Sequence, residues 1–325
     1  MSILAIIVTY GNRFHYLNQV VKRLLDEEIK KIIIISNGSD EITKKLIFDL
    51  KKKNKKIKLI ILKKNYGSAF AIKKGLISAL KTYYKFILLL DDDNLPASGS
   101  VKILEKEYRK HGNSYKNIFS PNRYKLKYYN NLQFKNNSFQ FLNNNFIKFN
   151  FLHIVYFFIK SIFSKSVKIK KNILMQVAPY GGLFFNKKII KIIGYPNTDF
   201  FLYADDFDFT LRMTRSNFNI YYCKDYLIKD LDKTLDENNY FSKKINEKKI
   251  FFQVRNHTYF SRNFINNKFA YYSNMCIFLF YFILRNFIIT TDKFFFFKRL
   301  YLIIKAIKSG NSKRLISYKN NIIND

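Results

Sequence analysis

The sequence is poor in cysteine and in acidic residues, and each shortage excludes a class of protein. Its 325 residues contain two cysteines, Cys223 and Cys276, which lie far apart and lack metal-ligand spacing. Neither a disulfide framework nor a zinc site is predicted, and a reducing compartment is expected. Asp and Glu number 23 against 58 Lys and Arg, so the formal net charge is +35. Such a charge implies an anionic partner: nucleic acid, anionic lipid or a phosphorylated substrate.

Long apolar runs and the common phosphate-binding loops are also missing. Residues 2–8 lack the charged start of a signal peptide, so we expect none. Residues 270–284 come closest to a membrane span, but Arg285 closes them before the ~20 apolar residues that a span needs. We therefore expect a cytoplasmic protein at the inner face of the cell membrane. The absence of GxGxxG after the first apolar run, and of GxxxxGK[ST] anywhere, argues against a dinucleotide oxidoreductase and a P-loop NTPase.

The first 97 residues alternate short apolar runs with segments of helical spacing. Strands are predicted over residues 3–9, 32–36, 57–62 and 86–90, with helices between them. This alternation predicts an α/β fold with a Rossmann-like, mostly parallel sheet and right-handed crossovers.

Three aspartates, Asp91, Asp92 and Asp93, directly follow the apolar run 86–90. Parallel sheets bind ligands at the carboxyl ends of their strands. Three adjacent carboxylates repel one another, and a cation among them would offset that repulsion. Mg²⁺ or Mn²⁺ suits such hard oxygen ligands, with substrate phosphate oxygens as the remaining ligands. The triplet therefore predicts a metal-diphosphate clamp. The alternative is an acidic, solvated turn ended by Pro96.

The other three strand ends carry small or polar residues suited to a nucleotide. Candidate ligands for base, ribose and phosphate are Thr9, Tyr10, Asn37, Asn65 and Gly67, with Arg13, Lys73 or Lys74 for phosphate. Each motif taken singly is also ordinary turn chemistry.

A second acidic stretch stands out in this basic chain, because residues 199–208 hold four acids and no Lys or Arg. A helix is predicted to begin just before Asp205 and Asp206, where its dipole stabilises acids by ~0.3–1 kcal/mol. The dipole does not account for Asp208 or for Arg212, although these two residues are spaced for an i,i+4 salt bridge. We favour the functional interpretation, a general base with substrate anchors.

Two further segments bear on partners. The apolar block 149–163 is predicted as a helical cover for the sheet, in preference to a membrane-interface helix. From residue 269 on, aromatics alternate with Lys and Arg, which favours an interfacial helix on anionic lipid over a groove for single-stranded nucleic acid. The predicted domains are 1–262, with a nucleotide half 1–97, an insert 124–174 and an acceptor half 175–262, followed by a basic aromatic tail 263–325.

Taken in order, these stretches resemble the nucleotide-sugar glycosyltransferases of family 2, in the galactofuranosyl and rhamnosyl transferase branch. The resemblance covers roughly residues 3 to 262. Its motifs are Ile-Val-Thr-Tyr, Ser-Asn-Gly-Ser, Asn-Tyr-Gly-Ser-Ala, Leu-Leu-Leu-Asp-Asp-Asp, Gly-Gly-Leu-Phe-Phe, Phe-Leu-Tyr-Ala-Asp-Asp-Phe-Asp-Phe with its Arg, and Val-Arg-Asn-His.

The resemblance implies a GT-A fold, an inverting reaction, a UDP- or dTDP-linked donor and Mg²⁺ or Mn²⁺. Asp91 and Asp93 match the metal-binding positions, and Asp92 lies near the donor. At Asp230 this chain departs from relatives that often carry a metal-binding His there, and Asp can ligate the same ions. Thr9, Asn37 and Asn65 match positions that contact the nucleotide.

The resemblance also assigns the second acidic stretch. Asp206 matches the acid that takes the proton from the acceptor hydroxyl, with Asp205 and Asp208 shaping the acceptor site. The second acid cluster, together with Gly181 and Gly182, favours a site for a sugar acceptor over the active site of a nucleotidyltransferase.

Two alternatives stay open. One is a basic nucleic-acid-binding protein with structural aspartates, and the other is a nucleotidyltransferase. The favoured hypothesis is transfer of a sugar to a glycan or a lipid-linked glycan in cell-surface polysaccharide synthesis, with the sugar undetermined.

Overall fold

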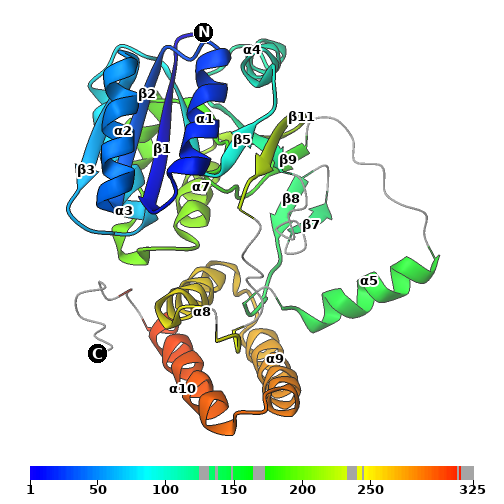
Figure 1. The fold of residues 1–325 in the computed structure, drawn as a ribbon. Helices are drawn as coiled ribbons and strands as arrows, with labels where there is room; N and C mark the ends of the chain where they lie inside the picture. The colour runs from blue at the N-terminus through cyan, green and yellow to red at the C-terminus, as the bar shows by residue number, and fades with distance from the viewer. Residues whose placement is uncertain are drawn as a thin grey trace.

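Four parallel strands form the first half of the sheet in the computed structural model, which describes residues 1–123, 132–135, 138–147, 149–163, 173–232, 240–243, 245–312 and 315. The elements are β1 (Ile3–Gly11), α1 (Phe14–Asp26), β2 (Lys31–Ser39), α2 (Glu41–Lys53), β3 (Ile57–Leu62), α3 (Ser68–Leu80) and β4 (Phe86–Asp91). The strands lie in the order β3-β2-β1-β4, all parallel. The predicted strands, helices and parallel pairing of this half are confirmed (Figure 1).

The second half of the sheet is mixed. It contains β5 (Asn94–Pro96), β6 (Asn117–Arg123), β7 (Leu132–Lys135), β8 (Ser138–Phe141), β9 (Ile173–Met175), β10 (Phe184–Asn186) and β11 (Asn219–Asp230). The sheet continues from β4 as β10-β6-β11-β9-β8-β7, and β5 pairs with β11. Strand β10 is antiparallel to both β4 and β6, whereas β6 and β11 are parallel. The α/β class with a mainly parallel central sheet is confirmed.

Helices cover both faces of the sheet because the strand side chains alternate. Leu4 and Ile6 of β1 pack with α3, α6 (Lys188–Ile193) and α7 (Asp205–Arg215), and Ala5 and Ile7 pack with α1, α2 and α4 (Ser100–Lys110). Both faces are apolar and buried, as expected for a parallel sheet. The strand ends that carry the polar motifs are therefore held by a rigid core.

A layer of three helices lies beyond one end of the sheet (Figure 1). It consists of α8 (Glu247–Ser261), which is followed by the 3₁₀ turn η3 (Arg262–Phe264), and of α9 (Lys268–Ile289) and α10 (Lys293–Gly310). These helices share a core cluster that includes Phe252, Tyr271 and Phe296. A Cβ on Gly310 would lie 2.5 Å from the Arg255 carbonyl oxygen, so α10 approaches α8 closely. The predicted domain boundary at residue 262 thus separates helices that pack on one core.

Two sequence expectations about apolar segments are wrong. Helix α5 (Phe151–Phe163) projects away from the body instead of covering the sheet (Figure 1). Leu152, for example, is 73% exposed. Among the described residues, other helices pack on the two faces of the central strands. Helix α9 runs past Arg285, and by length and composition it is long and apolar enough to cross a membrane.

Candidate active site

The ends of β1 and β4 meet at the site that the sequence predicts. The Thr9 hydroxyl donates a hydrogen bond of 2.7 Å to Asp92 Oδ2, and both side chains are buried. Parallel register brings these residues together, since Val8 pairs with Asp91. Thr9 therefore orients an aspartate of the triplet, in addition to its predicted place beside the nucleotide.

Arg13 lies among three carboxylates at this edge. Its Nε donates to Asp92 Oδ1 at 2.8 Å, its Nη2 to Asp93 Oδ2 at 2.9 Å and its Nη1 to Asp232 Oδ2 at 2.6 Å. The guanidinium carbon lies 5.2 Å from the centre of the Tyr10 ring. A planar guanidinium with several donors suits such a set of acids. Arg13 thus neutralises part of the negative charge at this edge, and its predicted contact with phosphate stays a prediction.

Asn37 joins the loops that follow β2 and β3. Its Nδ2 donates to Asn65 Oδ1 and to the Gly67 carbonyl oxygen, both at 3.1 Å, and its Oδ1 accepts from the Tyr66 amide at 2.9 Å. Asn65 Oδ1 also accepts from the Gly67 amide at 2.8 Å. Asn37 is buried, whereas Asn65 is exposed. The structure gives Asn37 the role of shaping the loop.

Asp230 pairs with an arginine at the end of β6. Arg123 Nη2 lies 2.5 Å from Asp230 Oδ1, and Asn94 Nδ2 donates to the same oxygen at 2.9 Å. Asn94 Nδ2 also lies 3.2 Å from Asp93 Oδ1. Sequence reasoning named neither Arg123 nor Asp232 as a site residue, and the only signal for each was its position at the end of a strand.

The Gly181-Gly182 pair allows a close approach of the backbone to this cluster. A Cβ on Gly181 would collide with Asn94 Oδ1 and lie 2.9 Å from Arg123 Nη1. Gly182 has φ +92°, which favours glycine, and a Cβ there would lie 2.5 Å from Pro121 Cγ. Close packing therefore explains why glycine occupies both positions, whether or not these residues also contact the acceptor as predicted.

Burial raises the pKa of every carboxyl in the triplet. The pKa of Asp91 is raised to about 7, first by burial and then by Asp93. The pKa of Asp92 is raised to about 6 by burial, which the charge of Arg13 partly offsets. Burial also raises the pKa of Asp93, again against Arg13. A cation bound among these acids would lower their pKa values and favour their charged forms.

The triplet fits a divalent ion through two carboxylates. Asp91 and Asp93 are hard oxygen donors, and Mg²⁺ or Mn²⁺ commonly takes one or two carboxylates with substrate phosphate oxygens. Within the described ranges, no three His, Cys, Asp or Glu side chains form a group able to hold a metal. Asp230 pairs with Arg123, and a share for Asp230 in the metal site stays a prediction.

A strained loop leads into the second acid cluster. Phe201, Tyr203 and Ala204 have φ values of +64°, +67° and +58°, and each such residue costs ~1–3 kcal/mol. Asn256 Nδ2 compensates by donating to the carbonyl oxygens of three loop residues, Phe200 at 2.7 Å, Leu202 at 2.6 Å and Tyr203 at 3.1 Å. The Val-Arg-Asn-His motif on α8 thus holds the loop.

Helix α7 begins with Asp205 and Asp206, as the sequence predicts. Ser68 at the start of α3 donates to Asp205 Oδ2 at 2.9 Å. Burial, followed by the charge of Asp206, raises the pKa of Asp205 well above its ordinary value. Asp206 Oδ1 accepts from the Phe207 amide at 2.8 Å.

The predicted salt bridge between Asp208 and Arg212 forms at 3.1 Å. Arg212 also donates to the carbonyl oxygens of Ile193 at 2.5 Å and Tyr195 at 2.9 Å. These contacts fasten α7 to the segment after α6. Roles for Asp208 and Arg212 at an acceptor stay predictions.

The two acid clusters belong to one site. Ser68, which donates to Asp205 Oδ2 at 2.9 Å, directly follows the Asn65–Gly67 loop at the strand ends. The charge of Asp206 also adds to the raised pKa of Asp91, and the charge of Asp91 to that of Asp205. The helix-start acids therefore lie at the edge of the sheet that carries the strand-end motifs.

Comparison with known proteins places this site in a family. No curated protein sequence matches the chain. The chain resembles the structure of GalNAc-T7 with UDP, GalNAc and Mn²⁺, at TM-score 0.52 and 10% identity, over 72% of this chain but only 44% of that one. It also resembles a mannosyltransferase from Pyrobaculum calidifontis in complex with GDP-Man and Mn²⁺, at TM-score 0.54 and 10% identity, over 96% of this chain and 76% of that one.

At such identities these likenesses concern the fold. The sequence model described as glycosyl transferase family 2 matches residues 5–169, just over half of the 325 residues. That stretch holds Thr9, Asn37, Asn65 and the aspartate triplet, so the match covers the strand-end half of the site. The chain therefore belongs to glycosyl transferase family 2.

Proposed function

We propose that this protein transfers a sugar, with inversion, from a UDP- or dTDP-linked donor to a hydroxyl of a glycan or lipid-linked glycan. Galactofuranose and rhamnose are the sugars that the family resemblance suggests, and galactose and glucose stay open. The reaction is placed at the cytoplasmic face of the cell membrane, in the synthesis of a cell-surface polysaccharide. The observation that carries the proposal is the hydrogen bond from Ser68, at the strand-end edge of the sheet, to Asp205 of the second acid cluster, because this reaction needs acids on both sides of the sugar.

The two similar structures support a nucleotide-sugar as the donor class. GalNAc-T7 was solved with UDP and Mn²⁺, and the mannosyltransferase with GDP-Man and Mn²⁺. In this chain Asp91 and Asp93 would hold Mg²⁺ or Mn²⁺. A divalent ion bound there supplies Lewis-acid stabilisation of the negative charge on the departing diphosphate.

The chain's own side chains divide the remaining work. The acceptor hydroxyl oxygen bonds to the anomeric carbon, the bond from that carbon to the diphosphate oxygen breaks, and the nucleoside diphosphate leaves with the bonding electrons. Asp206 accepts the hydroxyl proton. Arg13 lies where it can exchange Asp93 for a phosphate oxygen, since guanidinium binds both groups in the same planar geometry.

Asp206 rather than Asp205 is the proposed base because their surroundings differ. Asp205 is 3% exposed and its raised pKa favours the protonated form. Asp206 is more exposed and lies in the first turn of α7, where the helix dipole favours a charged carboxylate. Two neighbouring acids with one proton give a base and a neutral partner.

The test is a panel of nucleotide sugars assayed for metal-dependent release of nucleoside diphosphate, together with thermal stabilisation by UDP plus Mn²⁺. Ligand that binds the folded state raises the melting temperature. Stabilisation by UDP only when Mn²⁺ is present, with turnover of one donor, supports the proposal. Stabilisation by single-stranded DNA and by no nucleotide would support a nucleic-acid-binding protein instead.

A further inference from the structure

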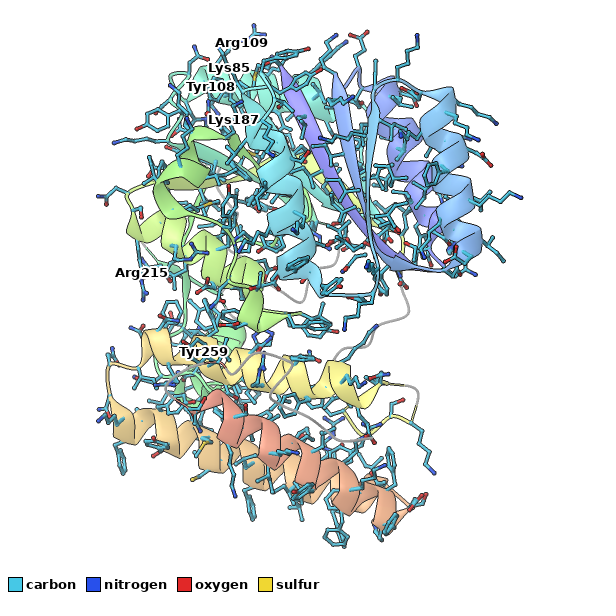
Figure 2. The ribbon with its side chains drawn as sticks, turned by 90° about the vertical axis from the view of Figure 1, so that its left-hand side faces the viewer. Lys85, Tyr108, Arg109, Lys187, Arg215 and Tyr259 are labelled. Carbon is cyan, nitrogen blue, oxygen red and sulfur yellow. The ribbon has the colours of Figure 1, made fainter. Side chains whose placement is uncertain are left out.

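We infer that the outward faces of α5, α9 and α10 form one docking surface for an anionic lipid bilayer, on which α9 lies in the plane of the membrane. This inference does not depend on the proposed reaction. Figure 2 shows the helical layer at the end of the molecule opposite Lys85 and Arg109, with many ring side chains directed away from the sheet.

The outward face of α9 is apolar where the outward face of a soluble helix is polar. Phe269, Phe280 and Ile288 are exposed on it, with Phe280 73% exposed. Only 11% of its most apolar window is buried inside the protein. Helix α9 is therefore not a core helix, and its exposed rings and aliphatic chains lack a cover within the described part of the chain.

Helix α10 adds cations to the same layer. Its exposed side chains include Phe294 and Tyr301 beside Lys305 and Lys308. Residues 268–310 contain seven Lys and Arg against one acid, Asp292. Apolar rings interleaved with lysine are the composition of helices that bind the interface of an anionic membrane. Charge complementarity thus selects an anionic bilayer as the occupant.

The first residue of helix α5 contacts α9, and α5 extends the apolar surface. The Phe151 amide donates to Asn274 Oδ1 of α9 at 2.9 Å, and the Phe149 and Phe278 rings lie 5.7 Å apart. Its thirteen residues give a length of ~20 Å, which is too short to cross a bilayer. A short apolar helix exposed beside α9 fits shallow insertion.

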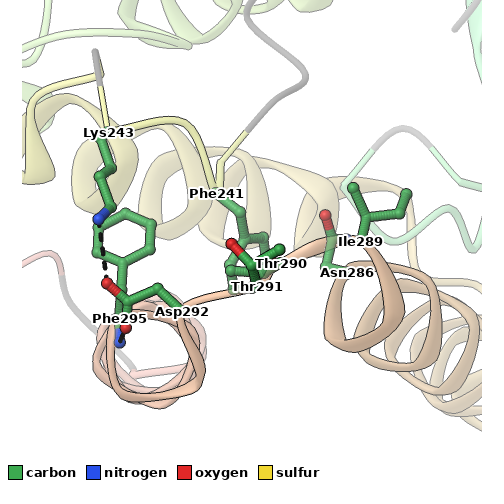
Figure 3. A pocket seen from close by; sticks show the side chains of 8 residues that line it. All are labelled: Phe241, Lys243, Asn286, Ile289, Thr290, Thr291, Asp292 and Phe295. Atoms are coloured by element: carbon green, nitrogen blue, oxygen red, sulfur yellow. Dashed lines mark hydrogen bonds and ion pairs between the residues drawn. The ribbon is translucent and has the colours of Figure 1, made fainter.

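Contacts on the inward side of α9 favour lying on the membrane over crossing it. Asn274 of α9 donates to the Asn144 carbonyl oxygen at 2.8 Å, and Phe282 packs on Phe241. The turn into α10 lines a pocket of about 240 Å³, beside which Lys243 and Asp292 pair at 3.0 Å (Figure 3). A spanning α9 would have to lose these polar contacts to lipid, at a free-energy cost.

The absence of tryptophan from the chain makes a direct test possible. Phe280→Trp places a single fluorophore on α9. Tyr83→Trp places one at a 78% exposed position two residues from Lys85, at the opposite end of the molecule. With vesicles of phosphatidylglycerol and phosphatidylcholine, the emission of F280W should shift to the blue and be quenched by bromines near the headgroup end of the acyl chains. The emission of Y83W should not change.

A charge variant sharpens the test. Lys305→Gln and Lys308→Gln should each weaken vesicle binding ~5-fold, because each cation near an anionic surface contributes ~1 kcal/mol. Lys45→Gln, on the exposed face of α2, is the matched control and should leave binding unchanged. Circular dichroism without lipid verifies that each variant folds.

Three results would overturn the inference. The first is an F280W emission that does not respond to anionic vesicles. The second is quenching deepest at the bilayer centre together with resistance to alkaline extraction, which would mean that α9 spans. The third is binding to RNA with no binding to vesicles, which would make the face a nucleic-acid surface.

Discussion

The two acid clusters of the site handle their charge in different ways. At the strand ends, arginines neutralise the aspartates: Arg13 contacts Asp92 and Asp93, and Arg123 contacts Asp230. At the start of α7, Asp205 receives a hydroxyl hydrogen bond from Ser68 instead, and its raised pKa favours a proton.

This difference indicates a division of roles. A guanidinium can exchange one oxyanion for another, which suits the strand-end acids to a site shared with a cation and a diphosphate. A buried carboxyl beside a second carboxyl has a raised pKa that favours its protonated form, which suits the helix-start acids to proton transfer. The predictions below test whether the two clusters can be separated experimentally.

The largest expected effect separates binding from turnover. Asp206→Asn should lower turnover ~10²–10⁴-fold, the usual contribution of a general base, while stabilisation by UDP plus Mn²⁺ persists. Asp93→Asn should lose that stabilisation as well as turnover. Activity assays and thermal melts on both variants measure the split. Asp49→Asn on α2, where the side chain is 48% exposed, is the control, and full activity in both site variants would contradict the assignment.

The next effect concerns the support of the strained loop. Asn256→Ala removes three hydrogen bonds to backbone carbonyl oxygens of residues 200–203 and should destabilise the protein by ~3 kcal/mol. Turnover of the folded fraction should fall as well, because the loop positions Asp206. Urea denaturation and activity measured on folded protein give the two values. Asn263→Ala, at an exposed position after α8, should change neither by much. If Asn256→Ala equals wild type in stability and in turnover, the loop keeps its conformation without Asn256.

A smaller effect tests the cation among the strand-end acids. Arg13→Lys keeps the charge but cannot contact three carboxylates in one plane, so the metal-free protein should lose ~1–2 kcal/mol. Arg13→Gln should lose more, and Mn²⁺ should raise its melting temperature more than that of wild type. Equal Mn²⁺ effects in the two proteins would mean that Arg13 and the ion do not share the acids.

Much of the fold and part of the site followed from the sequence for local reasons. Apolar runs predicted the parallel strands, and the register of β1 and β4 places Thr9 beside Asp92. The contacts of Arg123 and Asp232 could not be predicted, because their partners lie 107 and 219 residues away in the chain. The exposure of α5 was missed for a similar reason. Apolar composition favours burial, but the packing of other helices decides whether the sheet has room.

The smallest effect is the pH dependence of stability at the helix-start acids. The pKa of Asp205 is raised in the folded state, so between its unfolded value of ~3.9 and its folded value the native protein binds more protons than the unfolded chain. The free energy of unfolding should therefore fall as the pH rises through this window, by at most ~1.4 kcal/mol per unit. Asp205→Asn keeps an acceptor for Ser68 but removes the proton.

Urea denaturation at pH 5 and pH 8 tests this sign. Wild type should lose more stability than Asp205→Asn over that interval. Asp40→Asn is the control, because the hydrogen bond from the Thr43 amide lowers the pKa of Asp40 and places its titration below pH 5. Asn is also a good helix N-cap, so this change should leave the wild-type slope intact. If wild type and Asp205→Asn lose the same stability, Asp205 is already charged at pH 5, which would contradict its proposed role as the neutral partner of Asp206.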